Sequence, residues 1–139
     1  AELGPDLSRF ANVKHFCSWL GLCPATKISG GKVLSGNTKR SANRVRQALK
    51  MAAMSLSRSQ SALGAFYRRL CARMDKPRAN TATAHKLARM VYFMLTRGEA
   101  FVDQGQQRYE EQQRQRSIAA LKRRAAALGF QINPVGAAA

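Results

Sequence analysis

Helical periodicity is the feature that most restricts the fold of this chain. In its middle third, apolar residues recur at steps of four, three and four, at Val45, Leu49, Ala52 and Leu56. That spacing places them on one face of an α-helix. A later segment that includes Leu87 and Leu95 is apolar on nearly all sides after Arg89, which is typical of a helix surrounded by other helices. The pattern predicts an all-α fold, with this later helix at the centre of a compact bundle.

Capping residues and helix breakers divide the chain into four to five predicted helices. Asn12 is placed to cap the first helix and Gly21 to end it, while Gly98 ends the central one. We interpret residues 75–77 as a turn, because Pro77 disfavours helical geometry in the residue before it. Gly64 looks like a weak point near the start of a helix. The predicted helices cover residues 13–20, about 42 onward, 62–74, about 81–96, and part of 104–130.

The length and composition predict a single domain. With 139 residues, 45% of them hydrophobic, the chain can bury one core but not two. We expect a helical core over residues 1–103 and a disordered tail over 131–139. Residues 104–130 should form a helix that is polar at first and amphipathic later. That helix either folds back on the core or projects from it, and the sequence leaves both arrangements open.

A loop over residues 24–41 interrupts the helical pattern. Glycine and proline recur there among Ser, Thr, Asn and Lys, which is typical of irregular structure. Within the loop, Lys27-Ile28 and Val33-Leu34 suggest the two arms of a short β-hairpin. The fold class is therefore all-α, with an irregular or short β-hairpin loop.

The charge of the chain indicates a polyanionic partner. Lys and Arg number 24 against 7 Asp and Glu, which gives a net charge of +17. Nucleic acid is the usual partner of so basic a protein, and an anionic membrane surface is the weaker alternative. We expect no membrane span and no signal peptide, and hence a cytoplasmic protein. The three cysteines have neither the spacing of a disulfide framework nor that of a zinc site.

The segment Ser29-Gly30-Gly31-Lys32 is the one candidate catalytic site. The two glycines would allow backbone amides to approach a phosphate closely. A serine hydroxyl is a weak nucleophile, however, and needs a base, a metal or strong positive charge to activate it. Composition alone favours an ordinary flexible loop. The candidate nucleic-acid-binding residues that surround the segment are Lys27, Lys39, Arg40, Arg44, Arg46 and Lys50.

Several blocks of the sequence, taken in order, resemble the C-terminal transposase domain of the insertion-sequence "one-ten" family. This family includes Piv-type DNA invertases and bridge-RNA-guided serine recombinases. The blocks that carry the resemblance are residues 19–24, Ser29 to Lys32, Thr38 to Arg40, Val45-Arg46, residues 67–70, 84–88 and 95–98, and the segment with Asp103, Gly105 and Tyr109. The resemblance extends over essentially the whole chain.

The resemblance implies a DNA recombinase in which Ser29 is the nucleophile and forms a covalent phosphoserine link to DNA. Gly30 and Gly31 would shape its loop, and Lys32 would bind the scissile phosphate. Four acidic residues for Mg²⁺ would belong to an N-terminal RuvC-like domain that this chain lacks, so no metal site is expected here. A guide RNA and a homo-oligomer are further implied partners besides DNA, in a bacterial cytoplasm.

This chain departs from the family pattern in two respects. Ser41 stands where a glycine is common in the family, which concerns the shape of the loop. The seven carboxylates also offer no multidentate Mg²⁺ site. We therefore expect this polypeptide alone not to cut DNA. The alternative function is a non-catalytic, nucleic-acid-binding helical module.

Overall fold

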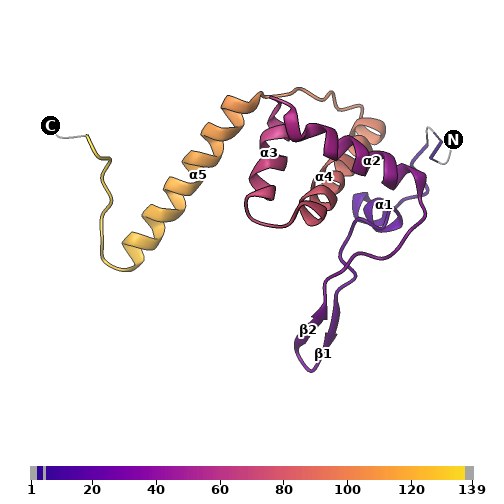
Figure 1. The fold of residues 1–139 in the computed structure, drawn as a ribbon, viewed down its shortest axis with the longest axis horizontal. Coiled ribbons are helices and arrows are strands. Elements are labelled where there is room, and N and C mark those ends of the chain that lie inside the picture. The colour runs from indigo at the N-terminus through magenta and orange to yellow at the C-terminus, as the bar shows by residue number, and fades with distance from the viewer. Residues whose placement is uncertain (1–2, 5, 137–139) are drawn as a thin grey trace.

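A computed structural model describes residues 3–4 and 6–136 of the chain. It confirms the predicted all-α class: five α-helices and one short antiparallel hairpin make up the described part (Figure 1). The elements, in chain order, are α1 (Val13–Trp19), β1 (Lys27–Ser29), β2 (Lys32–Ser35), α2 (Arg44–Ser55), the 3-10 helix η1 (Leu56–Arg58), α3 (Ala62–Cys71), α4 (Lys76–Arg97) and α5 (Gln106–Ala127).

Helix α4 is the centre of the bundle, because α1, α2 and α3 all pack against it. The apolar residues on nearly all its sides predict this position. Ala84 and Ala88, one turn apart on α4, are fully buried, and so is Ala53 on α2. Side chains this small let the two helix axes approach closely. The core is completed by aromatic and aliphatic residues from the first helix and its flanks and from α4, namely Leu7, Phe16, Leu20, Leu22 and Tyr92.

The first helix is capped as the sequence predicts, although its buried face differs from the predicted one. The Asn12 side chain accepts a hydrogen bond from the His15 amide, and Gly21 follows the helix with a φ of +69°. The helical spacing of Phe16, Trp19 and Leu20 predicts that these three form the buried stripe, but Trp19 is 39% exposed, whereas Cys17 is buried. The indole packs against Phe10 and lies under the guanidinium of Arg9, at the rim of the core.

Helix α4 begins at Lys76, five residues before the predicted start, so the prediction of a turn at residues 75–77 is wrong. Asp75 has extended backbone angles and precedes the helix, and Pro77 lies in the first turn. Proline is tolerated there because the first amides of a helix have no partner within it. The predicted end is correct, since Gly98 closes the helix with a φ of +62°.

Helix α5 is joined to the bundle through α3. The Arg68 guanidinium donates to the carbonyls of Ser57 and Ser59 and to Oε1 of Gln106 at the start of α5. A carboxylate oxygen of Asp103 accepts from the Ala62 amide, the first residue of α3. Beyond this joint the helix extends away from the bundle (Figure 1). The first half of α5 packs beside α3 and α4, and its second half projects, so each of the two arrangements that the sequence left open describes part of the helix.

The chain after α5 turns at Gly129. The Phe130 amide donates to the Ala125 carbonyl and the Gly129 amide to that of Ala126, which is the hydrogen-bond pattern of a Schellman stop. Of the predicted disordered tail, residues 137–139 lie outside the described residues. The predicted domain division at residue 103 stays a prediction.

Candidate functional site

The segment around Ser29 forms a β-hairpin, close to the arms that the sequence suggested. Lys27↔Ser35, Ile28↔Val33 and Ser29↔Lys32 are paired, with an irregularity between Lys27 and Ile28. The pairing continues toward the bundle through a bridge between Pro24 and Thr38. At the turn, each strand is one residue longer than predicted, because it includes Ser29 in β1 and Lys32 in β2. Ser29 therefore lies within a strand rather than in a flexible loop.

Gly30 and Gly31 are the two residues of the turn. Their φ angles are +55° and +75°, and positive φ at both central positions is the mark of a type I′ turn, which matches the twist of a two-residue hairpin. A Cβ on either glycine would meet no atom within 4 Å. Backbone angle, not lack of space, therefore requires glycine here.

Ser29 and Lys32 stand directly opposite each other beside this turn. Side chains of directly paired residues leave the same face of a hairpin, with Cβ atoms about 5 Å apart. Both residues are exposed, and within the described residues the Ser29 hydroxyl has no hydrogen-bond partner. The structure thus pairs an accessible hydroxyl with an ammonium group, a relation that the four-residue motif alone does not reveal.

The hairpin projects from the helices (Figure 1). Ile28 and Val33 form the next cross-strand pair, and each is 65% exposed. Neighbouring pairs on a strand face opposite sides. The side of the hairpin away from Ser29 therefore presents apolar surface to solvent.

Arg46 connects the base of the hairpin to α2. Its guanidinium donates to the Lys39 carbonyl at 3.0 Å and to the Thr38 hydroxyl at 3.4 Å. A Cβ on Gly21 would lie 3.2 Å from the same guanidinium, so the side chain fills the space between two loops. Arg46 is one of the predicted nucleic-acid-binding residues, but its guanidinium already donates hydrogen bonds within the protein.

The other predicted basic residues gather at this base. Lys39, Arg40 and Lys50 line a hollow of about 360 Å³ together with Arg46. Lys39 also lines a second hollow, of about 450 Å³, which includes Lys27. Arg44, at the start of α2, is exposed and lines neither of these hollows. The structure brings together five of the six predicted cations.

The positive charge of this region follows from a feature of the sequence that the motifs do not reveal. No Asp or Glu occurs between Asp6 and Asp75, a stretch that contains α1, the hairpin, α2 and α3. The cations around the hairpin therefore have no carboxylate from their own segment to neutralise them. A binding site for phosphates needs this kind of uncompensated charge.

The thiols and the histidine near the hairpin base are shielded rather than activated. Burial raises the pKa of the Cys17 thiol to about 11, with a smaller contribution from Cys23. The Cys23 sulfur lies 3.8 Å from Nε2 of His85. Burial, and then the charge of Arg89, lowers the pKa of His85. These groups are poor candidates for a nucleophile and its base.

The described residues do not fit a Mg²⁺ site: nowhere in residues 3–4 and 6–136 do three or more His, Cys, Asp or Glu come together as metal ligands.

None of the described helices is both long enough and apolar enough to span a bilayer.

Comparison with known proteins gives one family match. Residues 1–68, from the start of the chain to the middle of α3, match the family described as the transposase IS116/IS110/IS902 family. The matched part contains the whole hairpin and α2. Neither the curated proteins nor the solved structures that were compared match this chain. The blocks of resemblance after residue 68 stay a prediction.

Proposed function

Because residues 1–68 belong to the IS116/IS110/IS902 transposase family, whose members act on DNA in transposition, we propose that Ser29 is the nucleophile of DNA strand cleavage. The observation that carries the proposal is the position of the Ser29 hydroxyl, exposed beside a two-glycine turn and directly opposite Lys32. A phosphate placed over this pair would meet a hydroxyl and a cation from the same face.

The proposed reaction is a transesterification. The Ser29 oxygen forms a bond to phosphorus, one phosphorus–oxygen bond of the DNA backbone breaks, and the leaving oxygen takes up a proton to become a free hydroxyl end. The product is a phosphoserine diester, which a DNA hydroxyl can attack in turn to rejoin the strands. Lys32 would offset the negative charge that develops on the phosphate oxygens.

Neither the hairpin nor its flanks contain a carboxylate that could accept the Ser29 proton. We propose that a second surface, the RuvC-like domain implied by the family resemblance, docks on the hairpin. The exposed Ile28 and Val33 pair suits an apolar contact of this kind. Mg²⁺ would belong to that second surface, as would any guide RNA and the contacts of a homo-oligomer.

The test is a search for a covalent adduct. The transposase, with its metal-binding domain and guide, is incubated with end-labelled DNA and Mg²⁺, denatured, and analysed for labelled protein. We expect an adduct with the natural residue and none with Ser29→Ala. Ser35→Ala, at the other end of β2, is the matched control and should retain it. An adduct that persists in Ser29→Ala, with recombination intact, would refute the proposal.

A non-catalytic nucleic-acid-binding module is the second candidate, and the hollow lined by Lys39, Arg40 and Lys50 favours it. The logarithm of the binding constant falls as the logarithm of the salt concentration rises. If these side chains bind phosphates of duplex DNA, each lost contact should make that slope less negative by about 0.9. Replacing Lys39, Arg40 and Lys50 together by Gln should therefore make it less negative by about 2.7. An unchanged slope would exclude this hollow as the binding surface. A binding-only protein would form no adduct under any condition.

A further inference from the structure

A separate cavity, open to solvent on one side, lies between α3, α4, the first half of α5 and the connection before α5. Its volume is about 500 Å³, within the range of small-molecule sites. Phe66, Arg69, Lys86, Tyr109 and Arg116 line it. No residue of the hairpin, of α1 or of α2 contributes to this lining, so the cavity is separate from the Ser29 site.

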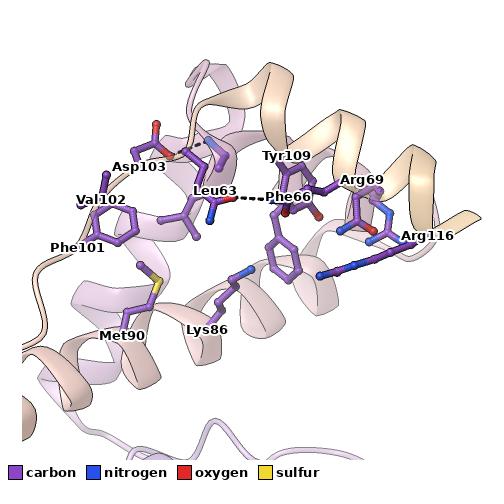
Figure 2. A pocket seen from close by; sticks show the side chains of 14 residues that line it. Leu63, Phe66, Arg69, Lys86, Met90, Phe101, Val102, Asp103, Tyr109 and Arg116 are labelled. Carbon is purple, nitrogen blue, oxygen red and sulfur yellow. Dashed lines mark hydrogen bonds between the residues drawn. The ribbon is translucent and has the colours of Figure 1, made fainter.

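Three cationic side chains line the cavity. Figure 2 shows Lys86 of α4 and Arg116 of α5 reaching toward the ring of Phe66, with Arg69 of α3 nearby. Among the ion pairs of the described residues, none involves these three side chains. The pKa of Lys86 is lowered, first by burial and then by the charge of Arg116, so the two cations lie close enough to repel each other.

Asp103 is the acidic residue of the lining. Its carboxylate accepts the hydrogen bond from the Ala62 amide, where the first turn of α3 presents unpaired amides. This carboxylate therefore serves the end of a helix, and the cavity keeps a net positive charge. A cavity that concentrates like charges in this way attracts an anion.

Aromatic rings form the other part of the wall. Phe66 and Tyr109 meet edge to face, with centroids 6.4 Å apart, and the Lys86 ammonium lies 4.1 Å from the Phe66 centroid. The Tyr109 hydroxyl is buried and, among the described residues, has no hydrogen-bond partner.

We propose that this cavity binds one nucleotide of a single-stranded nucleic acid, with the base against Phe66 and Tyr109 and the phosphate on Arg69, Lys86 and Arg116. Aromatic faces with adjacent cations are how proteins hold unpaired nucleotides. The net charge of +17 favours a nucleic acid over a phosphopeptide, which shares this chemistry. Arg69, Lys86, Tyr109 and Arg116 lie beyond the part of the chain that matches the transposase family. The proposal therefore does not depend on Ser29.

The test measures binding of the chain to a nine-residue oligothymidylate with 2-aminopurine at its centre, whose emission reports stacking on an aromatic ring. A ribo-oligouridylate with the same probe distinguishes RNA from DNA, and the tighter of the two identifies the natural ligand. A phosphotyrosine peptide tests the competing class. The pocket variant is Arg69→Gln with Arg116→Gln. The control, Arg123→Gln with Arg124→Gln, removes the same charge from exposed positions of α5 that do not line the cavity.

We expect the pocket variant to bind the oligonucleotide roughly tenfold or more weakly than the control, and to lose the change in 2-aminopurine emission. Phe66→Leu should weaken binding by roughly 5- to 150-fold, the range for one stacked base. Ser29→Ala should bind like the natural chain, so a failure of the proposed catalysis would leave this result intact. Equal binding by the pocket and control variants, or tighter binding of the phosphotyrosine peptide than of either oligonucleotide, would overturn the proposal.

Discussion

Replacing Gly64 by alanine should destabilise the bundle, because α3 and the chain around η1 touch at this residue. A Cβ on Gly64 would overlap the Ser59 carbonyl oxygen and would lie 2.9 Å from the Ser59 carbonyl carbon and 3.0 Å from the Leu56 carbonyl oxygen. All three atoms belong to the backbone, so no side chain can rotate out of the way. The sequence suggested that Gly64 weakens a helix, whereas the structure makes it the residue that permits a close contact.

The magnitude follows from two opposing effects. Overpacking costs about 1–3 kcal/mol, and a clash with backbone belongs at about 3 kcal/mol. Alanine is the better helix former by about 1 kcal/mol. We expect a net loss of about 2 kcal/mol in the free energy of unfolding. Because the Ser59 carbonyl also accepts from Arg68, its displacement should in addition loosen the joint with α5.

Two further glycine-to-alanine changes serve as matched controls. Gly36 has no positive φ, and a Cβ added there would meet no atom within 4 Å, so Gly36→Ala should be neutral or stabilising by under about 1 kcal/mol. Gly31 also has open space but a φ of +75°. Gly31→Ala should strain the turn by about 1–2 kcal/mol, an effect confined to the hairpin.

The assay is urea and thermal unfolding followed by circular dichroism, with amide exchange of the hairpin measured by NMR. For a chain of this length a loss of about 2 kcal/mol lowers Tm by roughly 5–8 °C. Gly64→Ala should show this drop, and Gly31→Ala should lose amide protection in the hairpin alone. A Gly64→Ala protein as stable as the Gly36→Ala protein would refute the close contact between α3 and Ser59.

Three other predictions concern the surroundings of the candidate site. Arg46→Met should keep the helices folded but speed amide exchange at the hairpin base, because two hydrogen bonds from α2 are lost; unchanged exchange would show that Arg46 does not brace the hairpin. The folded protein holds the pKa of His85 below its usual value of 6.5, so the unfolded chain binds more protons as the pH falls below about 6.5, and stability should decrease there; His85→Gln should remove this step in a series of melts from about pH 8 to about pH 5. Since burial raises the pKa of Cys17 to about 11, only about one thiol in a thousand is ionised at about pH 8, and mass spectrometry after iodoacetamide treatment should find Cys17 modified in urea but not in buffer.

The sequence predicted those parts of the fold that depend on local pattern. Helix α2 follows from the spacing of Val45 and Leu49, and Gly98 ends α4 because an αL residue commonly follows a helix. The start of α4 was mispredicted because Pro77 has two opposite effects: it disfavours a helix before it and favours one that begins there. Which effect prevails depends on the packing of Ala79 and Asn80 against the bundle, which is tertiary information.

In the candidate site, too, the sequence predicted the local features but not those that depend on how segments pair and pack. The glycines at 30 and 31 are visible in the sequence, and so are the short apolar arms beside them. The register that sets Lys32 opposite Ser29 is not, because a shift by one residue would move every side chain to the other face. The cavity around Lys86 was also not predictable, since its lining comes from three helices and from the connection before α5.

The hairpin also sets a distance between the helices and whatever its tip touches. Ser29 is five positions beyond the bridge at Pro24, and strands rise about 3.3 Å per residue, so the tip stands about 16 Å beyond the bridge. The major groove of DNA is about 8.5 Å deep. An arm of this length lets the tip reach a backbone phosphate while the bundle remains outside the duplex. Shortening both arms by two residues would preserve the facing of every side chain and reduce that reach by about 7 Å, which makes arm length a geometric variable that can be changed without altering any residue at the tip.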